Sequence, residues 1–258
     1  MDWKTLIVEK EGPVVRVWLN RPECRNALDQ TALQELTEAF QALRTDFEVK
    51  VVVLGGKGPT FCAGADLRNA PGLPRMTTVS GVSAREQRWL GELGARALDA
   101  IENLDAITIA RIQGHAVGGG VLLALACDFR IAAEGTSFWF PEVEFGTLLD
   151  WRGVPRLIRE IGFARARQMV VLSEHFDTVQ ADNCGLLNEK VPLGELDSAI
   201  SAYVARLIQT PELALLISKA QFRAYAARSV IGNCSEFEAE LLIRTLSSET
   251  ARAGFRSK

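Results

Sequence analysis

The chain has 258 residues, of which 48% are hydrophobic and 24% are charged, the ordinary balance of a globular protein. Its net charge of -3 argues against a protein that binds nucleic acid through a general excess of basic residues. No apolar run approaches the ~18 residues that span a bilayer, and residues 1–4 (MDWK) lack the pattern of a signal peptide. Five cysteines without metal-ligand spacing predict reduced thiols, a cytoplasmic location and no metal site.

The first half of the chain predicts strands that alternate with helices. Two strands, over 6–8 and 14–19, flank a Gly-Pro turn and precede an amphipathic helix that Asp29 caps. The pattern continues with an apolar strand over 49–54, a mobile surface loop over 69–83, a helix over 84–104, a strand over 107–112, an apolar helix over 121–127 and a strand over 129–133. This alternation favours an α/β fold.

The pattern changes after about residue 192, where helices replace the alternation. Helices are predicted over 196–208, 211–228 and 235–246, and Pro211 suits the first turn of the second of these. We therefore predict two regions, a β/α core over 1–192 and a C-terminal helical region over 193–258.

Two glycine-containing turns stand out because each follows a predicted buried strand. The first is 61–67 (FCAGADL), and the second is 114–120 (GHAVGGG), which opens onto a helix. Glycines let the backbone approach a ligand closely, and a helix N-terminus offers unpaired amides that suit an anionic oxygen. One amide from each turn would form an oxyanion hole, although the glycines could instead serve only tight turns. Neither turn has the spacing of a phosphate loop or of a dinucleotide fingerprint.

Four motifs, in order along the chain, resemble those of the crotonase (enoyl-CoA hydratase/isomerase) superfamily. They are 19–29 (LNRPECRNALD), the first turn, the second turn with its continuation to Asp128, and 140–142 (FPE) followed by Gly146. The resemblance implies a crotonase-like spiral of ββα units, followed by helices that assemble homotrimers or hexamers built as dimers of trimers. It also implies an acyl-CoA thioester substrate, and no cofactor because coenzyme A is part of that substrate.

The resemblance also assigns roles around the two turns. The oxyanion amides carry over to Ala65 and Gly119, where they would stabilise the negative charge that develops on a thioester oxygen. Losing one such donor typically costs ~3–4 kcal/mol of barrier. Arg25 is expected to contact a phosphate group of coenzyme A, with a merely solvated charge as the alternative. The residues expected to contact the acyl-CoA are Arg25, Ala27, Ala63, Asp66, Leu67, Leu122, Trp139 and Trp151.

The reaction depends on the acids and bases near this platform. Hydratases of the family use two glutamates; here the first position is Leu122 and the second is Glu142. One carboxylate suffices to move a proton from C2 to C4, so isomerisation of 3-enoyl-CoA to 2-enoyl-CoA by Glu142 is favoured. Asp150 is a second catalytic candidate, because some isomerases of the family place an acid near this position. Its alternative role is to cap a helix before Trp151, paired with Arg152.

Three other interpretations stay open or are weighed against this one. The chain could be a hydratase that uses Glu142 with Asp150, or an acyl-CoA-binding homologue without turnover. One branch of the family binds RNA through a lysine-rich helix, but the candidate helices of this chain carry few lysines. We therefore expect no nucleic-acid partner and no membrane partner. Bulky groups such as Trp139 and Trp151 indicate a restricted acyl pocket.

Overall fold

The computed structural model describes residues 2–68 and 83–229 of the protein. The predicted helix over 235–246 and nearly all of the predicted loop over 69–83 lie outside these described residues. Within them, the main sheet has six strands in the spatial order β1 (Leu6–Glu11), β2 (Val14–Leu19), β3 (Val51–Gly56), β4 (Ile107–Ile112), β6 (Phe129–Ala133) and β8 (Glu189–Val191). A second sheet pairs β5 (His115–Val117) with β7 (Ser137–Trp139) in parallel.

The main sheet is mostly parallel, as an α/β fold requires. Strand β1 runs antiparallel to β2, and each later pair of neighbours is parallel. The described helices are α1 (Gln30–Leu43), α3 (Ala84–Gly91), α4 (Leu93–Glu102), α5 (Gly119–Ala126), α6 (Gly153–Val171), α7 (Thr178–Asn183), α8 (Leu196–Gln209) and α9 (Glu212–Ser229), with short 3₁₀ turns η1 (Pro22–Cys24) and η2 (Leu193–Glu195). The predicted α/β class is confirmed.

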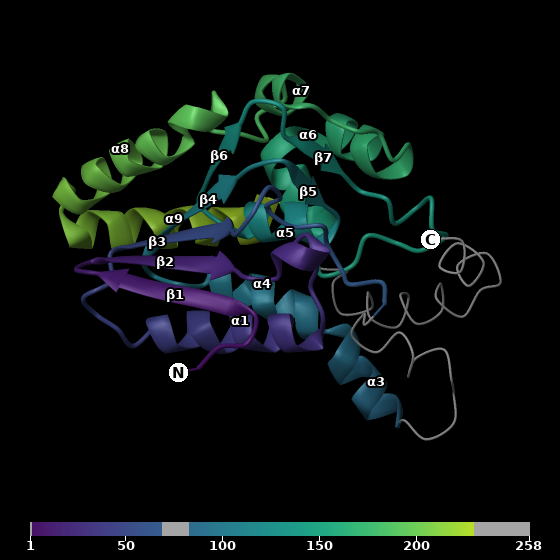
Figure 1. The fold of residues 1–258 in the computed structure, drawn as a ribbon, viewed down its shortest axis with the longest axis horizontal. Helices are drawn as coiled ribbons and strands as arrows, with labels where there is room; N and C mark the ends of the chain where they lie inside the picture. Colours follow the sequence, from purple (N-terminus) through teal and green to yellow (C-terminus); the bar gives the residue numbers. More distant parts are fainter. Residues whose placement is uncertain (1, 69–82, 230–258) are drawn as a thin grey trace.

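Alternating side chains of the central strands supply both faces of the main sheet. In β3, Val52 and Leu54 belong to the larger core, which includes side chains of α1, α4 and α5. Val51 and Val53 face the other way, into a smaller core that α8 completes. Figure 1 shows α1 and α8 on opposite sides of the sheet. Because β3 is covered on both faces, its sequence is a continuous apolar run.

The early elements follow the sequence prediction closely. Helix α1 begins after Asp29, whose side chain accepts a hydrogen bond from the Ala32 amide at 2.8 Å, so the predicted cap is confirmed. The single helix predicted over 84–104 is instead two helices, α3 and α4, which are interrupted at Glu92. Gly91, a residue of low helix propensity, immediately precedes this interruption.

Four elements between residues 137 and 191 have no counterpart in the sequence prediction. Strands β7 and β8 have three residues each, too few to show a period of two. Helix α6 is broken at Gly162 (φ 71°, ψ 168°), so its apolar residues do not follow one continuous helical period. Helix α7 has only six residues and begins at the capping box of Asp177 and Gln180.

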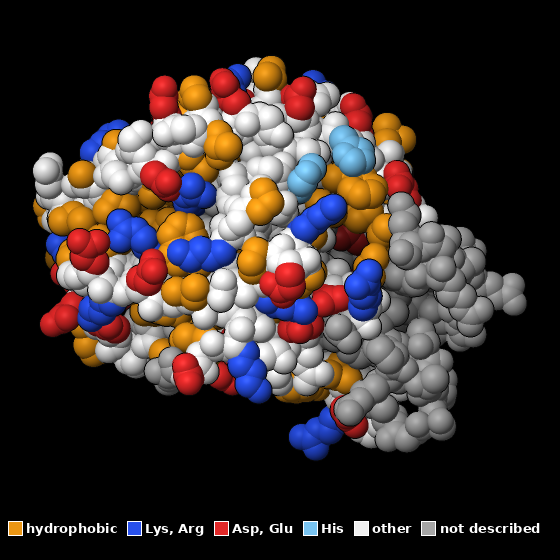
Figure 2. Space-filling model, viewed as in Figure 1, with side chains coloured by type: hydrophobic (Ala, Val, Ile, Leu, Met, Phe, Trp, Pro, Cys, Tyr) orange, Lys and Arg blue, Asp and Glu red, His pale blue; other side chains and the backbone are white. Residues whose placement is uncertain are grey.

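No single described helix has the length and apolar character needed to cross a membrane. The segments 193–209 and 212–226, bent by 109°, pass that test only as a pair, by length and composition. On the face shown in Figure 2, Lys and Arg side chains are interspersed with Asp and Glu side chains. The expected absence of nucleic-acid and membrane partners stays a prediction.

Candidate functional site

Short strand pairing brings the two predicted turns together. The Cys62 amide donates to the His115 carbonyl at 3.1 Å, and the Val117 amide donates to the Cys62 carbonyl at 3.0 Å. The first turn therefore runs parallel to β5, and β5 in turn pairs with β7. The two turns lie in close contact: a Cβ atom added to Gly64 would be only 3.4 Å from the Gly119 nitrogen.

The amides of Ala65 and Gly119 are available as donors where the turns meet. Leu28 donates to the Gly64 carbonyl at 2.8 Å and accepts from Asp66 at 2.9 Å, so the intervening Ala65 amide points away from Leu28. Gly119 is the first residue of α5, where an amide has no intrahelical acceptor. In the described part of the chain, neither amide donates to a protein acceptor. This arrangement suits a ligand oxygen.

A cavity of about 310 Å³ opens at this point, near the low end of the range for small-molecule sites. All but two of the predicted site residues line it. They are Arg25, Ala63, Ala65, Leu67, Gly119, Leu122, Trp139, Glu142, Asp150 and Trp151. Residues scattered over more than a hundred positions of sequence thus share one cavity.

Ala27 and Asp66 are the two predicted contact residues that do not line this cavity. Both contact Arg21 instead: its guanidinium donates to the Ala27 carbonyl and to the Asp66 carboxylate, the latter at 3.0 Å. The same guanidinium lies 3.3 Å from the Asp29 carboxylate. Arg21 therefore ties the first motif to the first turn, and Ala27 and Asp66 support the wall of the cavity from behind.

The position of Arg25 depends on an unusual local backbone. Arg25 and Asn26 both have a φ of 56°, a left-handed conformation that is uncommon outside glycine. The buried Asn26 side chain holds this turn, since it donates to the carbonyls of Lys57 at 2.9 Å and Thr60 at 2.8 Å. The Arg25 carbonyl accepts from the Ala63 amide at 2.9 Å, which connects the turn to the cavity.

Glu142 lies against the second turn. A Cβ atom added to Gly118 would collide with its Oε1, so only glycine allows this approach. Gly118 also has φ 49° and ψ -116°, a backbone conformation that other residues rarely adopt. Glu142 Oε2 is buried and has no hydrogen-bond partner within the described ranges. Burial raises the pKa of Glu142 to about 7, against a smaller opposing effect of a hydrogen bond with its own backbone.

Asp150 and Trp151 enter the cavity from the segment that precedes α6. The residue at the N-cap of α6 is Arg152, whose side chain makes no capping hydrogen bond. The capping role considered for Asp150 stays a prediction. Arg152, considered as its partner, pairs with Asp99. Leu122 is 1% exposed and packs its methyl groups against Gly153. The cavity wall is therefore apolar where the hydratases of the predicted family carry their first glutamate.

The Trp139 side chain points in the opposite direction to those of Phe138 and Phe140, because side chains alternate along a strand. Its ring lines the cavity, whereas Phe138 and Phe140 on either side are fully buried in the core. The Trp139 Nε1 donates to the Ser173 carbonyl at 3.0 Å, and the ring stacks on His175 with centroids 4.4 Å apart. These contacts hold the indole in one orientation at the edge of the cavity.

Sequence reasoning missed several residues of the lining. They are Gly64, Leu90, Gly91, Val117, Gly118, Pro141, Phe145, Thr147 and Leu148. Most of them lie within or beside the recognised motifs, so proximity in sequence could have indicated them. Leu90 and Gly91 belong to α3, and only the tertiary structure brings them to the cavity.

The Cys62 thiol and a second, larger hollow were the other candidates for a reactive site, and neither has the groups needed for one. Burial raises the pKa of the Cys62 thiol to about 12, which leaves it unsuited to act as a nucleophile. A larger hollow of about 740 Å³, whose lining includes Arg16, Lys57 and Arg111, lacks both turn amides and Glu142. Among the described residues, no three His, Cys, Asp or Glu side chains are grouped so that they could hold a metal ion.

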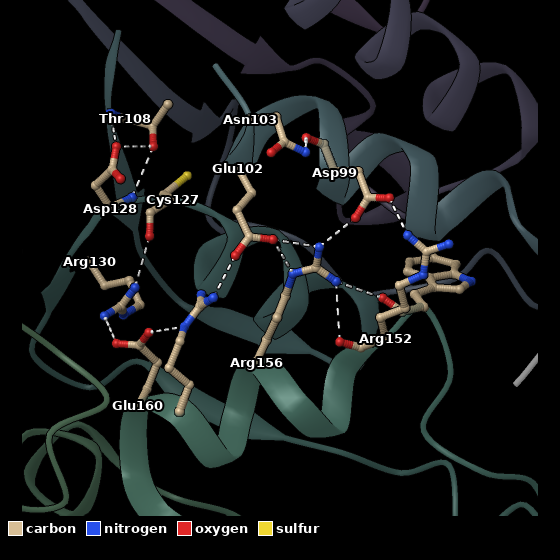
Figure 3. Close-up of polar contacts among 12 residues, drawn as sticks. Asp99, Glu102, Asn103, Thr108, Cys127, Asp128, Arg130, Arg152, Arg156 and Glu160 are labelled. Carbon is tan, nitrogen blue, oxygen red and sulfur yellow. Dashed lines mark hydrogen bonds and ion pairs between the residues drawn. The ribbon is translucent and has the colours of Figure 1, made fainter. Parts of the chain in front are cut away.

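A chain of alternating charges behind the cavity joins α4 to α6 (Figure 3). Its centre is Arg156, whose side chain is 6% exposed and donates to Glu102 and Asp99, each at 2.7 Å. Arg156 also donates to the carbonyls of Trp151 at 3.1 Å and Arg152 at 3.2 Å. The network therefore fixes the backbone from which Trp151 enters the cavity.

Comparisons with known proteins agree with the fold and the motifs. The family model for enoyl-CoA hydratase/isomerase matches residues 9–257. A crotonyl-CoA hydratase of Syntrophomonas wolfei is 34% identical over 221 residues, which cover 85% of this chain and 82% of the relative. An enoyl-CoA isomerase/hydratase of Mycosarcoma maydis is 33% identical over 215 residues, 80% of this chain and 75% of that protein. The crystal structure of an enoyl-CoA hydratase from Mycobacterium avium subsp. paratuberculosis has a TM-score of 0.87 at 26% identity, covering 99% of this chain and 96% of that one.

Proposed function

Since the chain belongs to the enoyl-CoA hydratase/isomerase family, which acts on acyl-CoA thioesters, we propose that it converts 3-enoyl-CoA to 2-enoyl-CoA. The observation that carries this proposal is the buried carboxylate of Glu142, which lies against the second turn. Leu122 occupies the place of the first hydratase glutamate and cannot hold or activate water. Glu142 alone can carry one proton between two carbon atoms.

The proposed reaction begins when ionised Glu142 removes a proton from C2 of the substrate. The electrons of that C–H bond move towards the thioester oxygen, and the resulting negative charge is stabilised by the Ala65 and Gly119 amides. Protonated Glu142 then returns the proton to C4, and the double bond moves from C3–C4 to C2–C3. Because the proton is returned, the step needs no cofactor beyond the coenzyme A of the substrate. A pKa of about 7 suits Glu142 to both halves of this transfer.

A second candidate function is the hydration of 2-enoyl-CoA by Glu142 together with Asp150. Asp150 lines the same cavity as Glu142, and the names of the similar relatives mostly say hydratase. In this reaction one carboxylate would take a proton from water while the other gives a proton to C2. The two functions therefore differ in whether Asp150 is required.

The test supplies the purified protein with 3-enoyl-CoA and, separately, with 2-enoyl-CoA. We expect isomerisation of the first substrate, its loss in Glu142→Gln and its retention in Asp150→Asn. Rapid hydration of the second substrate that disappears in Asp150→Asn would overturn the isomerase proposal in favour of the hydratase. Binding of both substrates without turnover of either would instead indicate a homologue that only binds acyl-CoA.

We also propose that the protein assembles as a homotrimer, or as a hexamer of two trimers. Helix α9 carries large apolar side chains that are exposed to solvent, namely Leu213, Leu216, Ile217, Phe222 and Tyr225. Contiguous exposed apolar side chains typically mark an interaction surface. Light scattering of the full chain at micromolar concentration tests this proposal, and a monomeric mass would overturn it. The cytoplasmic location stays a prediction.

A further inference from the structure

The Trp151 indole occupies a slot between two helices that is bounded by glycines. A Cβ atom added to Gly94 of α4 would overlap Cδ2 and Cε2 of the ring, and one added to Gly119 of α5 would overlap Cζ3. The fused edge of the indole therefore lies on α4, and its six-membered ring lies on the first residue of α5. Because neither position tolerates even a methyl group beside the ring, the indole fits this slot closely.

The same contact places the indole beside the reacting part of the substrate. Gly119 supplies one of the two amides assigned to the thioester oxygen, and the six-membered ring packs on its Cα side. The first acyl carbons are only one to a few bonds from the thioester carbonyl. With the carbonyl oxygen in the oxyanion hole, these carbons would therefore lie next to this ring. Leu122 and Leu148 line the same cavity and add apolar surface to it.

The backbone prevents the indole from swinging out of this position. Trp151 and Arg152 have φ values of 58° and 57°, and such a conformation persists in bulky residues only where the surroundings enforce it. The surroundings here are Arg156, which donates to both carbonyls, and Asp99, which pairs with Arg152 and Arg156. The ring is therefore a fixed wall of the cavity.

We propose that Trp151 determines substrate specificity by forming a fixed wall of the acyl cavity next to the oxyanion hole, which restricts the protein to short-chain acyl-CoA thioesters. The proposal rests on the proposed acyl-CoA site and names the substrate class that this site accepts. Trp151 acts here through its volume, and Arg156 and Asp99 act as positioning residues that hold it.

The test measures how affinity depends on acyl length, in the full chain and without turnover. Calorimetry with butanoyl-, hexanoyl-, octanoyl- and decanoyl-CoA gives this profile for the wild type, Trp151→Ala and the control Trp89→Ala. Trp89 lies on α3 and is not part of the cavity lining. We expect wild-type affinity to stop rising beyond hexanoyl-CoA, as in the control. In Trp151→Ala, each further methylene that becomes buried is expected to tighten binding about fourfold.

The outcomes separate this proposal from the proposed function. If the wild type binds none of the four thioesters, the acyl-CoA site itself is wrong. If the wild type binds them and Trp151→Ala leaves the length profile unchanged, Trp151 does not determine specificity. Should Trp151→Ala fail to fold, Trp151→Leu is expected to shift the profile in the same direction by fewer methylenes, and an unchanged profile in that variant would equally overturn the proposal.

Discussion

Replacing Glu142 with glutamine is expected to abolish turnover and to stabilise the fold at alkaline pH. Glutamine has nearly the same shape as glutamate but cannot ionise, and Glu142 Oε2 is buried with no partner within the described ranges. Burial raises the pKa of Glu142 from 4.5 to about 7. At about 1.4 kcal/mol per pKa unit, ionising this carboxyl costs the folded state about 3 kcal/mol.

The pH range of this effect follows from proton binding. In the unfolded chain Glu142 loses its proton near pH 4.5, whereas in the folded protein it keeps the proton to about pH 7. Between these values the folded state binds more protons, so the free energy of unfolding falls by up to about 1.4 kcal/mol per pH unit. The dependence ends below the lower value and above the higher one. Glu142→Gln lacks this contribution at every pH.

Urea denaturation at pH 5.5 and pH 8.5, at one fixed protein concentration, measures the difference. The stability advantage of Glu142→Gln over the wild type is expected to be about 2 kcal/mol larger at pH 8.5 than at pH 5.5. Glu144→Gln, which changes an exposed neighbour, is the matched control and should show no such increase. An equal advantage of Glu142→Gln at both pH values would refute the argument that burial raises this pKa.

Three further predictions concern the site and its support. The wild-type turnover rate should rise as the pH increases through about 7, because the ionised form of Glu142 starts the reaction; a flat rate profile from pH 6 to 8 would contradict this role. Gly118→Ala should lower kcat at least ~100-fold, since its methyl group collides with Glu142 Oε1, while circular dichroism remains that of the folded protein. Arg156→Met should lower the free energy of unfolding by about 1–3 kcal/mol, because it removes the hydrogen bonds that the nearly buried guanidinium donates to Asp99, Glu102 and the Trp151 carbonyl. Lys190→Met, which removes a partly exposed ion pair, should cost less than about 1 kcal/mol in the same denaturation experiment, and equal losses would contradict the importance of burial.

Local sequence patterns predicted those elements whose cause is local. The apolar period and the Asp29 cap predicted α1, and the continuous apolar run predicted β3. The same reasoning missed β7 and β8, which are too short to show a period, and α6, which Gly162 interrupts. Such elements form because neighbouring strands and helices stabilise them, and these neighbours are distant in sequence.

The sequence by itself determined the family, the two turns with Ala65 and Gly119, and Glu142 as a carboxylate beside them. Only the tertiary structure decided what surrounds these groups. It buried Glu142 enough to raise its pKa, and it placed the Trp151 ring between Gly94 and Gly119. It also placed Ala27 and Asp66 behind the cavity wall. Motifs and turn glycines depend on residues a few positions apart, whereas burial and fit depend on segments that meet only after the chain has folded.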